Sequence, residues 1–187
     1  GHLIHTPRYS IKENLQHRNI KATLNEDGTL LIKANTTYGG LQQDDIHGLI
    51  NNLSKDKVKE YLHEKFDFAT YDISNFTYTE NRAGMPTVNE SLDIAVTNYA
   101  TITGKRLFIV PNVMTRTSRK LTTDEERKYD IVFTIDYKDV DSVEITIPAG
   151  FTPESMPQDV TISNKFGKYN CSVKLAGNKL FYYRSIE

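Results

Sequence analysis

The sequence contains little that assigns it to a functional class at once. Its 187 residues include a single cysteine, Cys171, so no disulfide can form within the chain. No apolar run approaches the roughly 20 residues needed to span a bilayer, and no signal peptide is recognisable at the start. Gly1 stands where an initiator methionine would be expected. We therefore expect the chain to be a piece of a longer protein, and the missing signal peptide does not favour the cytoplasm.

A strong charge of one sign is missing as well. The chain has 23 basic and 24 acidic side chains and a formal net charge of −1, and no basic stripe stands out. This balance argues against a nucleic acid as the partner. The densest basic cluster, residues 116–120, lies in a segment rich in Thr and Ser, where solvent exposure explains it better than a phosphate site.

Alternation of apolar and polar residues is the dominant pattern. In residues 142–147, Val143, Ile145 and Ile147 alternate with polar side chains. Successive side chains of a strand point to opposite faces, so this pattern predicts a half-buried sheet. The polar loop that ends at Gly28 predicts a hairpin between two such runs. The expected strands cover residues 19–24, 29–34, 72–79, 90–101, 106–110, 128–135, 142–147, 170–175 and 179–184.

Two short helices interrupt the strands, at residues 44–52 and 55–66. Ser54 is a good N-cap for the second helix. Four apolar side chains of this helix fall on one stripe and should pack against a sheet. They are Val58, Tyr61, Leu62 and Phe66.

These patterns predict a mainly β fold, an antiparallel β-sandwich with one or two short helices packed on a sheet. The length suits one large β domain or two small ones. We expect residues 1–17 to lead into a β-sandwich domain at residues 18–187. A possible sub-boundary lies near residues 114–126, a polar stretch that reads as a crossing loop.

No constellation of side chains predicts catalysis. Cys171 lies mid-strand, with neither a following helix to lower the thiol pKa nor a downstream histidine to act as a base. His2 and His5 have workable spacing for zinc but stand at the chain start, and His63 lacks the second histidine of a metalloprotease helix. We therefore expect no catalytic, cofactor-binding or metal-binding residues.

Two features leave alternatives open. Asp136, Asp139 and Asp141 offer oxygen ligands for Ca²⁺, but turn formation explains them without a metal. The aromatic residues 181–183 suggest a carbohydrate platform. Adjacent strand residues face opposite ways, however, so packing in the core and at its rim is the favoured interpretation.

The order of several C-terminal motifs carries a resemblance. Arg127-Lys128-Tyr129-Asp130 is followed by a strand at residues 141–148, by Gly150-Phe151-Thr152-Pro153 with Met156-Pro157, by Phe166-Gly167-Lys168-Tyr169 and by Phe181-Tyr182-Tyr183-Arg184. This order resembles the C-terminal β domain of unknown function of Bacteroidetes transglutaminase-like proteins. Residues 3–7 and 25–30 resemble the segment just after the papain-like core of those proteins, so the resemblance covers most of the chain.

The resemblance implies a non-catalytic accessory domain of a secreted transglutaminase- or protease-like protein. The Cys-His-Asp core would lie upstream in the same polypeptide, and this domain would pack on it, with the surface near residues 3–9 facing the core. It would also shape a substrate cleft or bind a partner, and the parent protein would be exported to the periplasm or cell surface. The alternative is a stand-alone cell-surface module that binds a glycan or a peptide. An independent hydrolase is the least favoured hypothesis.

Overall fold

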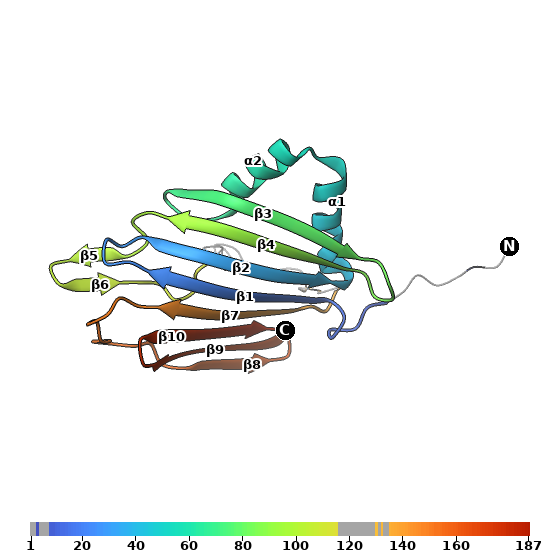
Figure 1. Ribbon diagram of the computed structural model, residues 1–187. Helices are drawn as coiled ribbons and strands as arrows, with labels where there is room; N and C mark the ends of the chain where they lie inside the picture. The colour runs from blue at the N-terminus through green and yellow to red at the C-terminus, as the bar shows by residue number, and fades with distance from the viewer. Residues whose placement is uncertain (1–2, 4–7, 116–129, 131, 133–134) are drawn as a thin grey trace.

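The computed structural model describes residues 3, 8–115, 130, 132 and 135–187. Strands dominate these residues, and two short helices stand together beside one end of the strand order (Figure 1). The elements are β1 (Leu15–Leu24), β2 (Leu30–Gly39), the 3-10 turn η1 (Gly40–Gln43), α1 (Asp44–Asn52), α2 (Lys55–Lys65), β3 (Tyr71–Asn81), β4 (Thr87–Val96), β5 (Thr101–Thr103), β6 (Arg106–Phe108), β7 (Lys138–Thr146), β8 (Val160–Asn164), β9 (Gly167–Ala176) and β10 (Lys179–Ile186).

Eight strands form one sheet in the order β3-β4-β2-β1-β7-β10-β9-β8, while β5 and β6 form a separate hairpin (Figure 1). Two antiparallel halves, β1–β4 and β7–β10, meet at β1 and β7, which run parallel with Leu15 opposite Lys138. The prediction of a mainly β fold with two short helices packed on a sheet is confirmed. The sheet is mixed rather than wholly antiparallel, because the two halves join through this one parallel pair.

Local strand signals locate most elements. The hairpin of β1 and β2 has the predicted turn, with Gly28 at a φ of +81°. Such a positive φ favours glycine, which has no Cβ to clash with the backbone. Strand β8 was not predicted, and all five of its residues are exposed at the sheet edge.

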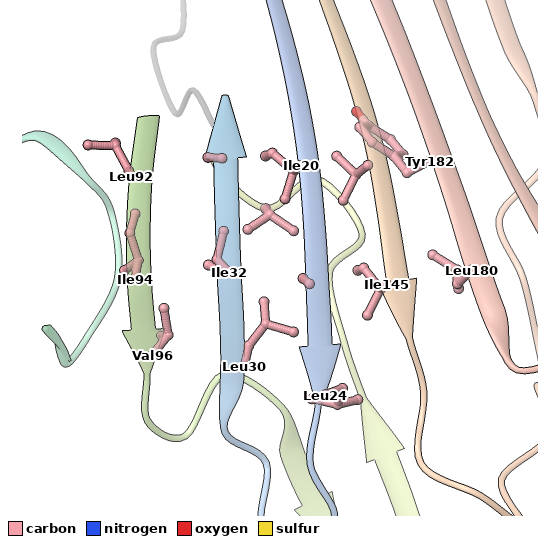
Figure 2. Close-up of a cluster of buried hydrophobic side chains, with 14 of the residues drawn as sticks. Ile20, Leu24, Leu30, Ile32, Leu92, Ile94, Val96, Ile145, Leu180 and Tyr182 are labelled. Carbon is pink, nitrogen blue, oxygen red and sulfur yellow. The ribbon is translucent and has the colours of Figure 1, made fainter. Parts of the chain in front are cut away.

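The hydrophobic core lies on one face of the sheet. Side chains from the neighbouring strands β4, β2, β1, β7 and β10 point to this face (Figure 2), and Ile73 of β3 and Val173 of β9 belong to the same cluster. Val58 and Leu62 of α2 are buried against it. Partly buried side chains from residues 66–71 and 99–114 complete the layer over the sheet. The labelled core side chains are Ile20, Leu24, Leu30, Ile32, Leu92, Ile94, Val96, Ile145, Leu180 and Tyr182.

Helix α2 begins as predicted, since the Ser54 hydroxyl accepts a hydrogen bond from the Lys57 backbone N–H at 3.4 Å. The predicted buried stripe is wrong at Tyr61, which is 40% exposed. Tyr61 lies at the edge of the stripe, where its ring contacts the ammonium of Lys65. Phe66 packs on the core but lies just past the helix end.

Some predicted features lie largely or wholly outside the described residues. These are the basic cluster at 116–120, the loop at 114–126, the strand at 128–135, the chain start with His2 and His5, and most of residues 3–9. Strand β1 begins at Leu15, so the last three residues of the segment 1–17 belong to the sheet. In the described part of the chain, no helix is long and apolar enough to cross a membrane.

Candidate functional site

A row of polar side chains crosses the inner face of the sheet beside the apolar core. Strand register places its members opposite one another on six consecutive strands, and all except Tyr78 are buried. We call this set the polar row. Its members, from β3 to β10, are Tyr78, Glu90, Thr36, Arg18, Asp141 and Arg184.

Asp141 is the centre of one half of the polar row. Its Oδ1 lies 3.2 Å from Nη1 of Arg18, and its Oδ2 accepts a hydrogen bond from Nη1 of Arg184 at 2.7 Å. Arg18 also donates to the hydroxyls of Thr36 at 3.2 Å and Thr115 at 2.8 Å. Arg18, Asp141 and Arg184 form an ion triad on β1, β7 and β10. This triad joins the two halves of the sheet where β1 and β7 run parallel.

Glu90 is the centre of the other half. Its carboxylate accepts hydrogen bonds from the hydroxyls of Tyr38 at 3.0 Å and Tyr78 at 2.8 Å, and Nζ of Lys65 lies 3.4 Å away. Burial and the negative charge of Glu90 raise the pKa of both tyrosines. Burial lowers the pKa of Lys65 from 10.5, and Glu90 counters part of that effect.

The buried side chains of the polar row have hydrogen-bond partners within the row or beside it. In the part of the chain described here, no buried side-chain nitrogen or oxygen lacks a hydrogen-bond partner. A buried charge that is paired and hydrogen-bonded stabilises a particular arrangement of strands, whereas an unpaired one would be costly. We therefore assign the polar row to strand arrangement rather than to ligand binding.

A small cleft lies where the chain enters the sheet. Its volume is about 260 Å³, and its walls come from Ile11, residues 135–137, β8, the β8–β9 turn and the end of β10. Several apolar side chains of this cleft are open to solvent: Ile135, Tyr137, Ile162 and Phe166 are 52%, 41%, 52% and 54% exposed. We call this surface the N-terminal cleft. Its second feature is β8, an edge strand that has no partner on one side among the residues that the structure describes.

A larger groove lies between the β5–β6 hairpin and the loop at residues 148–157. Its volume is about 880 Å³, within the range of ligand pockets. Phe108, Phe151 and Met156 are among its apolar lining residues. Arg106 and Glu154, both exposed, form an ion pair of 2.9 Å between the two walls. We call this surface the hairpin groove.

The residues considered for catalysis and metal binding are scattered. Cys171 lies inside β9, opposite Arg184 of β10, and is half-buried. His63 stacks on Tyr71, and His47 contacts Glu80. Among the described residues, no group of three or more His, Cys, Asp or Glu side chains is arranged to hold a metal ion.

The acidic residues considered for Ca²⁺ have other partners. Asp141 binds two arginines in the polar row, and Asp139 accepts a hydrogen bond from Nε2 of Gln42 at 3.0 Å. Burial raises the pKa of Asp139. The backbone carbonyl of Asp136 accepts a hydrogen bond from the Asn14 side chain. These contacts fix the start of β7.

The C-terminal aromatic residues divide between the two faces as strand alternation requires. Tyr182 is buried in the core, while Phe181 and Tyr183 are exposed on the outer face. Sequence reasoning missed the polar row altogether. The sequence does contain a signal for the polar row. Alternation within their strands places Arg18, Glu90 and Asp141 on the buried face, where a charged residue needs a partner.

Comparisons with known proteins give one match. Residues 105–187 match the family described as Domain of Unknown Function with solved-structure structure (DUF3858). This segment contains β6 to β10, both walls of the hairpin groove and most of the N-terminal cleft. No curated protein and no solved structure matches the chain. The match supports the prediction of a β domain of unknown function in the C-terminal part.

Proposed function

We propose that this chain is a non-catalytic accessory domain that packs against a transglutaminase- or protease-like catalytic core of the same polypeptide. The observation that supports this role is the N-terminal cleft. Exposed apolar side chains gather there, and Ile11 shows that the cleft adjoins the segment leading into β1. A few residues near the centre of an interface, aromatic ones prominent among them, supply most of its binding energy, so this surface suits a core attached at the same end.

The hairpin groove lies elsewhere on the domain and would stay open to a substrate or partner while the N-terminal cleft is covered. In this proposal the parent protein acts in the periplasm or at the cell surface, as the sequence resemblance implies. The polar row stabilises the domain, and Cys171 takes no part in chemistry.

The docking proposal is tested by hydrogen exchange on this chain and on the longer product of its gene. We expect protection to rise in residues 8–11, 135–137 and 160–169 of the longer product. Ile162→Ser should abolish this gain, because Ile162 is an exposed apolar residue of the cleft. Ile102→Ser is a matched control, since Ile102 is 49% exposed on the β5–β6 hairpin. A longer product without added protection in the cleft would refute the docking role.

The second candidate is a stand-alone module that binds an extended apolar peptide. The hairpin groove favours it, because its volume and apolar lining suit such a segment. This candidate predicts the reverse pattern in the same experiment. Protection would then change around residues 105–109 and 148–157 on peptide addition, and Ile162→Ser would leave it intact.

Catalysis is tested separately. We expect no turnover of a glutamine and amine substrate pair by this chain. Turnover that disappears in Cys171→Ala would show that the thiol is a nucleophile and would overturn the non-catalytic assignment.

A further inference from the structure

The outer face of the sheet, opposite the core, carries two neighbouring rows of side chains without Asp, Glu, Lys or Arg, although these four residue types make up 25% of the chain. We call them the neutral rows. Strand register gives the first as Thr77, Ser91, Asn35, Asn19, Ser142, Tyr183 and Ser172, and the second as Thr79, Asn89, Thr37, His17, Val140, Ser185 and Asn170.

Most side chains of the neutral rows are hydrogen-bonding groups that act as both donors and acceptors, although Ser185 is buried and accepts a hydrogen bond from the Asn170 amide at 3.4 Å. Asn, Ser and Thr side chains have this property, whereas Lys and Arg only donate and ionised Asp and Glu only accept. The Thr37 hydroxyl donates to Oδ1 of Asn89 at 2.7 Å, so these two side chains hold each other in place. Asn35, Thr37, Thr77, Thr79, Asn89 and Ser91 line a depression of about 280 Å³, together with Thr36 and Glu90 of the polar row.

An exposed aromatic ring extends the first neutral row. Tyr183 stands between Ser142 and Ser172 in strand register, and it is 42% exposed. Phe181, two residues earlier on the same face, is also exposed. A tyrosine ring offers an apolar face for stacking and a hydroxyl for hydrogen bonding.

The absence of charge from these positions narrows the class of ligand. An anion or nucleic acid would need cations, and a metal cation would need carboxylates. A protein interface would need an apolar centre, but Val140 is the one aliphatic side chain of the two rows. The adjoining row of the outer face does carry charges, with Lys33 opposite Asp93 and Lys21 opposite Glu144. Charge is therefore kept out of a bounded surface.

We propose that the neutral rows bind a neutral oligosaccharide. Its hydroxyl groups would exchange hydrogen bonds with the Asn, Ser and Thr side chains, and one sugar ring would stack on Tyr183. This activity goes beyond the accessory role proposed above, and it uses the opposite face of the sheet from the core. Failure of one proposal therefore leaves the other standing.

The test is electrophoresis of the full chain through native gels that contain xylan, β-glucan, galactomannan or amylose, with polygalacturonate as an anionic comparison. At least one neutral polysaccharide should retard the protein, and polygalacturonate should not. Titration with an oligosaccharide of the retarding polymer then gives the affinity. Tyr183→Ala should weaken it by about tenfold, comparable with the loss of one aromatic stacking contact.

Tyr61→Ala is the matched control, because Tyr61 is 40% exposed but belongs to α2 on the other face. It should leave the affinity unchanged, and Asn35→Ala should lower it without unfolding the chain. Three results would overturn the proposal: no retardation by any neutral polymer, retardation by polygalacturonate alone, or equal affinity of Tyr183→Ala and the unmodified chain.

Discussion

Replacing Asp141 by asparagine tests whether the polar row stabilises the fold. The substitution keeps the shape of the side chain but removes the charge that two buried guanidinium groups share. The side chains of Arg18 and Arg184 are 7% and 9% exposed, so neither can recover its lost interaction in water. The new amide NH₂ group would also face arginine donors.

The expected loss is about 3–5 kcal/mol of unfolding free energy, the usual result of removing one partner from a buried ion pair. In a domain of this size, 1 kcal/mol corresponds to roughly 2–4 °C in melting temperature. Asp141→Asn should therefore lower the melting temperature by roughly 6–20 °C. Urea unfolding at constant m-value gives the same quantity independently.

Glu144→Gln provides the control on the same strand. Glu144 pairs with Lys179, but that pair lies on the outer face with side-chain exposures of 27% and 46%. Its loss should lower the melting temperature far less than Asp141→Asn does, as for other exposed pairs. Equal destabilisation by the two substitutions would refute the view that burial of the polar row determines its energetic role.

Three further predictions concern the helix, the buried tyrosines and the first hairpin. Leu62→Ala should lower the free energy of unfolding by about 2–5 kcal/mol by leaving a cavity, whereas Lys59→Ala at an exposed position should change it by less than about 0.5 kcal/mol. The pKa of Tyr78 is raised above its ordinary value of 10.0, so the stability that Tyr78 contributes is complete below pH 10 and is lost as pH rises further. The urea concentration at the unfolding midpoint should therefore fall above pH 10, and it should fall less steeply in Tyr78→Phe. Gly28→Ala should destabilise more than Gly150→Ala in thermal unfolding. Both glycines have positive φ, but a Cβ at Gly28 would lie 2.9 Å from a backbone oxygen, whereas one at Gly150 would have no described heavy atom within 4 Å.

The sequence predicted those parts of the fold that depend on neighbouring residues. The first hairpin and the start of α2 follow from Gly28 and Ser54, whose effects extend over a few residues. The polar row depends instead on contacts such as that of Arg18 with Asp141, which are 123 residues apart. Alternation assigns a side chain to a face, but it cannot say which strands are neighbours, so the partners of a buried charge stay undetermined.

The same limit applies to the candidate surfaces. Strand alternation predicted that Tyr182 and Tyr183 lie on opposite faces of the sheet. The neutral rows become visible only when strand order brings Asn19, Asn35 and Tyr183 into line. Edge strand β8 also escaped prediction, because the alternation of Val160 and Ile162 with Thr161 and Ser163 covers only four residues, the shortest run that predicts a strand.

The extent of the family match leads to a prediction about where the folding unit ends. Residues 105–187 contain β7 to β10 but not β1, the parallel neighbour of β7. Without β1, Val143 and Ile145 would lose the strand beside them in the core, and Asp141 would lose Arg18.

We therefore expect residues 105–187 alone to lack cooperative unfolding, and the 187-residue chain to unfold in one transition. Circular dichroism during urea titration, together with amide dispersion in NMR spectra, distinguishes these outcomes. Cooperative unfolding of the shorter segment would mean that the seam between β1 and β7 joins two domains. If the shorter segment unfolds without cooperativity, the matched segment is half of one sheet. The reason would be that β1 and β7, with the ion triad that they share, make each half of the sheet part of the other half's core.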